Sequence, residues 1–168
     1  IGVLKEELRD SHSGGTEEGM IRASLKGLHG SPTEQAKVRS LLLTFAMVPE
    51  DTHCPLDVLL LMFNAVHAGT AATMMHIRKW LRVLLNRSLV LGTIDRPSLH
   101  DLVLDFAIAQ HSADELRENH RKIVMAFCAA RPLDGNGRRK FDYMQSEDSL
   151  SVYVCSEVEF HLRQSLVD

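Results

Sequence analysis

Apolar residues recur three and four positions apart along most of the chain, which is the spacing of amphipathic α-helices. Two of these segments follow clear helix-start signals. The Ser31–Glu34 stretch combines an N-cap Ser, a Pro at the first helical position and a Glu at the third, and Ser112–Glu115 is a second capping box. We expect helices to bury these apolar stripes: Ile21/Leu25/Leu28, Val38/Leu41/Leu42/Phe45, Leu56/Leu59/Leu60/Phe63, Met74/Ile77/Leu81/Leu84/Leu85, Leu116/Ile123/Phe127 and Val154/Val158/Leu162.

A non-helical stretch separates two of these segments. Residues 89–91 (Leu-Val-Leu) predict a short strand, and Gly92 with the Asp-Arg-Pro sequence at 95–97 predicts a turn. A helix should then begin at Ser98 as N-cap, with Asp101 at its third position in an S-x-x-D capping box. Because Pro97 cannot donate to a ladder, we expect only a minimal β-wing.

The helix that should begin at Ser98 carries the main candidate site. Its apolar face should comprise Leu99, Leu102, Val103, Phe106 and Ala107. His100 falls on the first turn, where backbone N–H groups have no partner inside the helix. An anion at this point could accept hydrogen bonds from the imidazole and from those amides.

The remaining stretches suggest where the chain divides. The short apolar pattern before residue 11 and the Ser/Gly-containing stretch at 11–15 predict a tail of a preceding helical domain over 1–15, followed by a break. Several helices, a strand, a tight turn and a closing helix follow one another in the order of a winged-helix domain, which we expect over 16–111, with further helices over 112–168 and a polar loop at 131–144. The chain begins at Ile1 within a pattern and without Met, so we expect an excised fragment.

Composition supports a mainly α fold. Apolar residues make up 45% of the 168 residues and aromatic residues only 5%, which favours helices over a sandwich or barrel. The net charge of −3 provides no basic excess for nucleic acid or an anionic membrane. The three cysteines are far apart and not in C-x-x-C spacing, which is typical of reduced thiols in a cytosolic protein. No signal peptide or apolar run of membrane-spanning length is present.

Several blocks together resemble the NB-ARC family of signalling ATPases. The block from Leu41 to Asp51, L-L-L-T-F-A-M-V-P-E-D, resembles the family's L-x-x-F-x-x-F-P-E-D block. The segments from Pro55 to Leu59 and from Leu84 to Val90 resemble the I-P-x-x-x-L … L-V-N-R-S-L-L block, and S-L-H-D-L-V from Ser98 resembles the M-H-D motif with Leu99 in place of Met. The blocks occur in the family's order and cover residues 20–109. The segments 116–131 and 149–166 resemble the helices that follow the winged helix in apoptotic protease-activating factors.

This resemblance implies a function for His100. In NB-ARC proteins the motif His contacts the β-phosphate of bound ADP and so holds the closed, inactive state. The resemblance implies the same for His100, with Ser98 and Asp101 capping and orienting the motif helix. It also implies joint binding of ADP or ATP with an upstream nucleotide-binding domain, release for homo-oligomerisation, and a cytoplasmic role in signalling of the apoptosis or plant disease-resistance type.

The sequence also limits this reading. No G-x-x-x-x-G-K-[ST] motif occurs, so this chain should not be an ATPase by itself. The alternative is a DNA-binding winged-helix regulator, in which Arg78, Lys79, Arg82 and Arg87 would face the major groove, although such cations are more often simply solvated.

Other functional readings of the histidines are weaker. His111 and His120 lack zinc-ligand spacing and should be solvated or locally bonded, and the Met-Met-His run from Met74 is expected to pack in the core. Ser98, His100 and Asp101 lie too close in sequence to form a catalytic triad.

Overall fold

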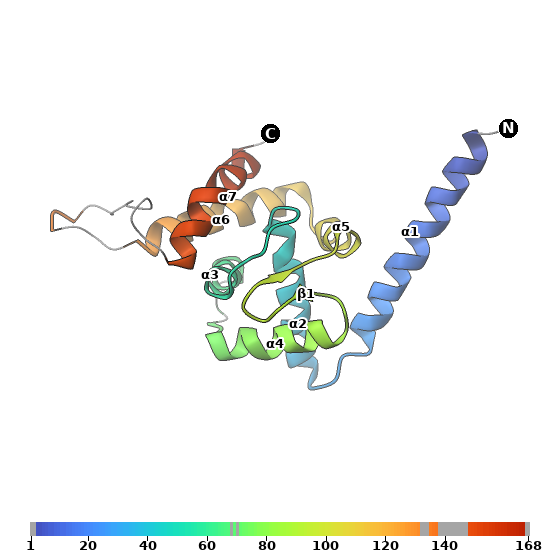
Figure 1. Cartoon of the computed structure of the whole chain (residues 1–168), viewed down its shortest axis with the longest axis horizontal. Helices are drawn as coiled ribbons and strands as arrows, with labels where there is room; N and C mark the ends of the chain where they lie inside the picture. Colours follow the sequence, from blue (N-terminus) through green and yellow to red (C-terminus); the bar gives the residue numbers. More distant parts are fainter. Residues whose placement is uncertain (1–2, 68, 70, 132–134, 138–147, 167–168) are drawn as a thin grey trace.

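The chain is mainly helical, with one small antiparallel sheet. The computed structural model describes residues 3–67, 69, 71–131, 135–137 and 148–166, with side chains from residue 15 onward. The elements follow one another as α1 (Val3–Lys26), α2 (Pro32–Thr44), the 3₁₀ turn η1 (Phe45–Met47), α3 (Leu56–Val66), α4 (Met74–Asn86), β1 (Leu91–Gly92), β2 (Pro97–Ser98), α5 (Asp101–Ala109), α6 (Ala113–Ala129) and α7 (Ser149–Leu166) (Figure 1). A helix therefore lies at each segment where the apolar pattern predicts one.

Helix α1 differs most from the expectation. The break predicted at residues 11–15 is wrong, because the backbone remains helical from Val3 to Lys26. Glycine lowers helix propensity by about 1 kcal/mol but does not clash with helical geometry, so a Gly pair weakens a helix without having to end it. Most of α1 extends away from the other helices, and its C-terminal part lies against α5 (Figure 1). The assignment of residues 1–15 to a preceding domain stays a prediction.

Two of the predicted helix starts are confirmed in detail. The Ser31 Oγ accepts from the backbone N–H of Glu34 at 3.2 Å, with Pro32 at the first helical position of α2. At α6, the Ser112 Oγ accepts from Glu115 N at 3.2 Å and a Glu115 carboxylate oxygen accepts from Ser112 N at 2.8 Å. These caps satisfy N–H groups that would otherwise have no partner in the first turn.

The core lies between α2, α3 and α4 and continues to α6 and α7. Its largest fully buried side chains include Phe45, Phe63 and Phe127, and the buried residues form one contiguous cluster. Helices α6 and α7 pack along each other and both contact α3. The predicted stripes are largely confirmed, except that Leu162 is 42% exposed. The expectation that the Met-Met-His run packs in the core is wrong for two of its residues, because Met75 is 77% exposed and His76 is exposed as well. Most of the predicted loop at 131–144 lies outside the described residues.

The sheet is a hairpin of two-residue strands. Leu91 pairs with Ser98 and Gly92 with Pro97, so the strand begins only at Leu91, the last of the predicted residues 89–91. Leu89 and Val90 are instead buried in the core, and the Leu89 N–H donates to Leu84 O at 3.0 Å. The predicted strand position is wrong because these two apolar side chains follow the end of α4 into the interior.

Gly92 makes the hairpin turn sterically feasible. Its φ is +79°, and a Cβ at this position would lie 2.5 Å from the carbonyl oxygen of Arg96. The turn closes through Thr93 N donating to Arg96 O at 3.3 Å and Arg96 N donating to Thr93 Oγ1 at 3.2 Å. Only a residue without a side chain fits both the backbone angle and the close approach.

Candidate functional site: the start of helix α5

His100, and not Ser98, is the N-cap of α5. Its backbone is extended (φ −77°, ψ 144°), and Asp101 is the first residue of the helix. Ser98 lies in β2, where it pairs with Leu91. The predicted capping box is therefore wrong, because the hairpin holds Ser98 in extended backbone two residues before the helix begins.

The capping contact constrains the imidazole. The backbone N–H of Leu102 donates to His100 Nδ1 at 3.4 Å, a long hydrogen bond. Because Nδ1 accepts, a neutral His100 carries its proton on Nε2, which can then donate one hydrogen bond. The side chain is exposed, and Nε2 has no partner within the described part of the chain. The arrangement places a single oriented N–H donor at the surface.

The backbone around His100 is fixed from both sides. Before it, the carbonyl of Pro97 accepts from Cys54 N at 3.1 Å, which attaches β2 to the segment leading into α3. After it, the carbonyl of His100 accepts from Val103 N at 2.8 Å and from Leu104 N at 3.0 Å. The backbone N–H groups of Leu102, Val103 and Leu104 therefore already have acceptors. An anion bound here would accept mainly from the imidazole, and not from several first-turn amides as the sequence suggested.

Helix α5 is positioned by a narrower apolar face than predicted. Val103, Phe106 and Ala107 are buried as expected, whereas Leu102 is 42% exposed and Leu99 is only half-buried. The prediction for Leu102 is wrong: Leu104, which is 9% exposed, completes the buried face instead. Leu102 lines a shallow surface pocket with Glu17, Glu18 and Ile21 of α1.

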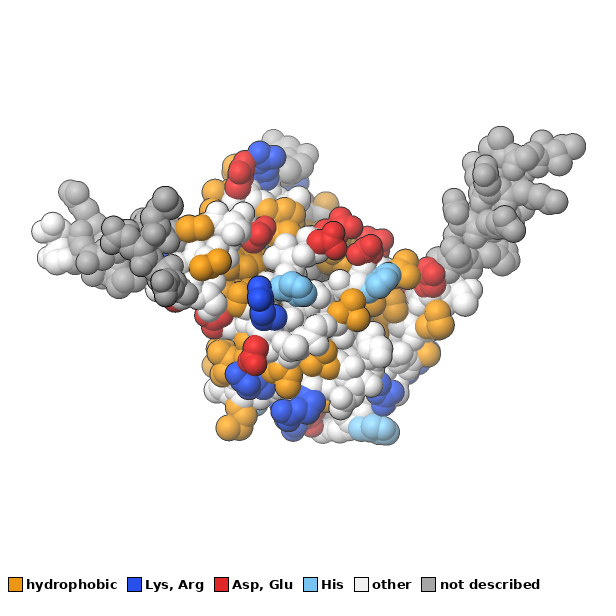
Figure 2. Space-filling view, in the orientation of Figure 1, with side chains coloured by type: hydrophobic (Ala, Val, Ile, Leu, Met, Phe, Trp, Pro, Cys, Tyr) orange, Lys and Arg blue, Asp and Glu red, His pale blue; other side chains and the backbone are white. Residues whose placement is uncertain are grey.

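The surface beside His100 is acidic. A groove of about 290 Å³ runs between α5, α6 and α7, and the carboxylates of Glu50, Asp101 and Asp105 line it together with Ile108. Figure 2 shows acidic side chains gathered over the region of α5. Negative potential disfavours a phosphate, so the cations needed for phosphate binding would have to come from another domain.

The basic set of α4 is largely engaged in surface contacts. Arg78 pairs with Asp95 of the hairpin turn at 2.8 Å, Lys79 pairs with Glu34 of α2, and Arg87 donates to the carbonyl of Gly27. Arg82 is exposed. Opposite charges within contact distance reduce the positive potential that a DNA-reading helix would need.

A buried histidine pair lies between α6 and α7 and was not predicted. The Nδ1 atoms of His120 and His161 lie 3.0 Å apart, and Tyr153 Oη lies 3.3 Å from His161 Nε2. The prediction that His120 is solvated or locally bonded is wrong, because it is 3% exposed and its partner is distant in sequence. Burial lowers the pKa of His120 to about 4 and that of His161 to about 3, so both rings are neutral.

The sequence contained a signal for this pair. His120 continues the stripe Leu116, Ile123, Phe127 at helical spacing, and His161 continues Val154, Val158. A histidine on an apolar stripe is a candidate for burial, and two such stripes on consecutive helices are candidates for mutual contact. The same packing buries Cys54 and Tyr153, and burial raises the pKa of the Cys54 thiol and of the Tyr153 phenol, which leaves both protonated.

Two further classes of site are not found in the described structure. Its His, Cys, Asp and Glu side chains form no group of three or more that could hold a metal ion. Within the same residues, each helix is too short or too polar to cross a bilayer.

Comparisons with known proteins do not add to this description. No protein-family model matches the sequence. Searches of curated proteins and of solved structures likewise gave no significant match. The functional assignment therefore depends on the motif blocks and on the geometry at the start of α5.

Proposed function

We propose that this chain is the regulatory winged-helix segment of a nucleotide-switched NB-ARC protein, in which His100 senses the phosphate of ADP. The observation that carries the proposal is the exposed imidazole of His100 at the N-cap of α5, with Nδ1 engaged by the backbone and Nε2 available as a donor. His100 is the His of the Leu-His-Asp sequence that resembles the M-H-D motif.

The order of elements supports a winged-helix fold for residues 16–111. Helices α2, α3 and α4 are followed by the hairpin β1–β2 and then by α5, so a tight two-stranded wing comes directly before the motif helix. The hairpin and the Cys54–Pro97 hydrogen bond hold the backbone that leads to His100. A sensor residue benefits from this arrangement because an oriented donor loses little conformational entropy on binding.

The acidic surroundings of His100 support shared binding of the nucleotide. Glu50, Asp101 and Asp105 would repel a phosphate bound by this chain alone. A phosphate held by cations of an upstream nucleotide-binding domain would be neutralised before His100 meets it. We therefore infer that ADP bridges the two domains in the closed state, and that opening of the interface permits oligomerisation in signalling of the apoptotic or innate-immune type.

The strength of the sensor contact can be estimated. One hydrogen bond to a charged group contributes about 1.5–3 kcal/mol. Loss of His100 should therefore weaken ADP binding by the parent protein roughly tenfold to a hundredfold or somewhat more, at about 1.4 kcal/mol per tenfold. Because ADP would favour only the closed state, the same change should raise basal oligomerisation.

A test on this chain separates the proposal from its alternative. Titration calorimetry should detect no sub-micromolar ADP binding by the isolated chain, because His100 supplies only one of the contacts a nucleotide needs. A gel-shift on random duplex DNA at low salt should show no tight complex. Tight DNA binding that falls steeply with salt would instead assign the chain to the DNA-binding winged helices, with α4 as recognition helix.

A further inference from the structure

A second concave surface lies between α1, α2 and α5, near the C-terminal end of α5. It encloses about 270 Å³ and has an apolar floor of Leu25, Leu42, Leu43 and Phe106. Its remaining lining residues are Arg22, Lys26, Arg39 and Gln110. We call this surface the α1–α2–α5 groove. His100 lies at the opposite end of α5, six residues before Phe106 and ten before Gln110, or roughly 9–15 Å along the helix.

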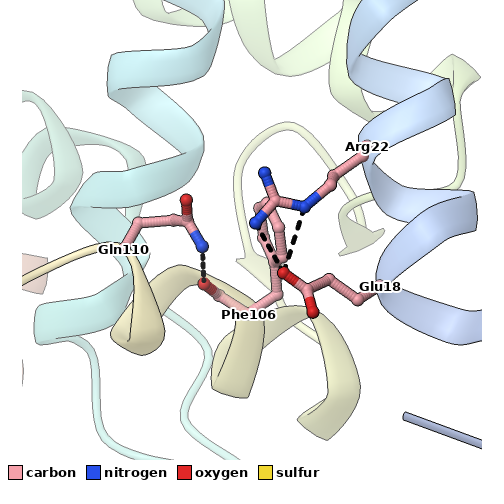
Figure 3. A network of polar contacts seen from close by, with 4 residues as sticks. All are labelled: Glu18, Arg22, Phe106 and Gln110. Carbon is pink, nitrogen blue, oxygen red and sulfur yellow. Dashed lines mark hydrogen bonds and ion pairs between the residues drawn. The ribbon is translucent and has the colours of Figure 1, made fainter. Parts of the chain in front are cut away.

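The charge of this groove is opposite to that of the rest of the molecule. Its three ionisable lining residues are all cationic, in a chain whose net charge is −3. Arg22 is partly neutralised, because Glu18 accepts from its Nη2 at 2.6 Å and from its Nε at 3.0 Å (Figure 3). Arg39 donates to the carbonyl oxygen of Leu25 at 3.1 Å. Within the described residues, neither Arg39 nor Lys26 forms an ion pair with a carboxylate.

The polar groups around the floor are held in place. The Arg22 guanidinium lies over the ring of Phe106, with its carbon 5.5 Å from the ring centroid. Gln110 Nε2 donates to Phe106 O at 3.3 Å, which leaves the amide side chain at the end of the groove (Figure 3). Phe106 is 7% exposed and therefore forms a fixed floor. The groove combines an apolar base with oriented cations from two helices.

We propose that the α1–α2–α5 groove binds an acidic amphipathic helix of a partner polypeptide, with a leucine-sized side chain on the floor and carboxylates on Lys26 and Arg39. Charge complementarity selects carboxylates, and the apolar floor selects a side chain of this size. The groove is half open and small, which suits one or two side chains of a helix better than an enclosed small molecule. This inference is independent of the nucleotide-sensing proposal, because it concerns other residues at the other end of α5.

The test uses this chain and three labelled synthetic helical peptides. The first has leucines at i and i+4 flanked by glutamates, and its twins carry glutamine or lysine in place of every glutamate. Fluorescence anisotropy should show that the glutamate peptide binds at least tenfold more tightly than the glutamine peptide, with the difference shrinking as salt is added. Equal binding of the glutamate and lysine peptides, or no binding of the glutamate peptide at millimolar concentration, would overturn the proposal.

Charge reversal in the groove tests the site itself, and charge reversal at an exposed residue outside the groove is the matched control. The double variant Lys26→Glu/Arg39→Glu should lose at least tenfold in affinity for the glutamate peptide and gain affinity for the lysine peptide. Arg82→Glu, which reverses an exposed cation on α4, should leave both affinities within twofold of wild type. Because the switched preference for the lysine peptide requires a folded groove, it distinguishes a lost contact from misfolding. Loss of binding by Arg82→Glu as well would show that only net charge matters and would refute the site.

Discussion

Single residues determine the local structure at two points of the described chain, Gly92 and His100. At Gly92, a positive φ coincides with the approach of the Arg96 carbonyl. At His100, one side chain both caps a helix and presents a donor to the surface. The first position could be inferred from sequence as a turn, whereas the second depends on where the helix begins.

The structure predicts a clear cost for a side chain at residue 92. Gly92→Ala places a Cβ 2.5 Å from Arg96 O and forces alanine into the left-handed region, so the turn must shift. We expect a loss of about 1–3 kcal/mol in the free energy of unfolding. Urea denaturation measures this loss. Gly69→Ala also has positive φ but no atom within 4 Å, so it should cost less, and equal costs would contradict the steric explanation.

At the scale of elements, the sequence correctly predicted where a helix begins when its cap is formed by residues a few positions apart along the chain. The caps of α2 and α6 are such cases. The start of α5 was predicted wrongly because ladder pairing of Ser98 and the Cys54–Pro97 hydrogen bond override a local capping box. The His120–His161 pair also depends on a contact between distant segments. Helical periodicity could suggest that each histidine is buried, but not that the two are in contact.

The packing of α5 gives a prediction that distinguishes its two faces. Phe106 is 7% exposed against the core, so Phe106→Ala should cost about 3–5 kcal/mol. Leu102 is 42% exposed, so Leu102→Ala should change the free energy of unfolding by only about 0.5 kcal/mol. Chemical denaturation of both variants measures the difference. Similar midpoints for the two would show that α5 is rotated from the orientation described above.

The α6–α7 interface should lose stability in mild acid. His120 and His161 have an ordinary pKa of 6.5 and folded values of about 4 and 3, so the unfolded chain binds more protons as the pH falls below 6.5. Their contribution is complete above pH 6.5 and decreases as the pH falls, by about 1.4 kcal/mol per pH unit for each histidine, down to about pH 4 for His120 and about pH 3 for His161. His67, whose pKa is also lowered by burial, acts in the same direction.

The measurement is the free energy of unfolding between pH 5 and 7, a range above the titration of Glu115. His120→Leu should reduce the pH dependence of the free energy of unfolding by roughly one proton. An unaltered slope in the His120 variant would show that the pair is not the source of the acid sensitivity.

At the scale of the whole molecule, α1, α5 and the acidic groove form surfaces without a counterpart in the described chain. Leu102 and Ile108 are exposed on α5; Ile108 lines the acidic groove, and Leu102 lines a pocket against α1. A winged-helix segment that closes on a nucleotide-binding domain would use such a surface. Sequence predicted the helical class, and Asp101 and Asp105 already place negative charge next to His100; the contribution of Glu50 could not be predicted, because Glu50 reaches the groove only through folding.

The most direct test of the central claim is ADP retention by the parent protein through gel filtration, comparing wild type with His100→Ala and His100→Asn. Asparagine is a good N-cap but is too short to replace the Nε2–H donor, so His100→Asn should preserve the start of α5. The account predicts that both variants lose ADP by roughly tenfold or more in affinity, while His100→Asn unfolds at the wild-type denaturant concentration. Wild-type retention by His100→Asn would contradict the claim and leave His100 as a helix cap.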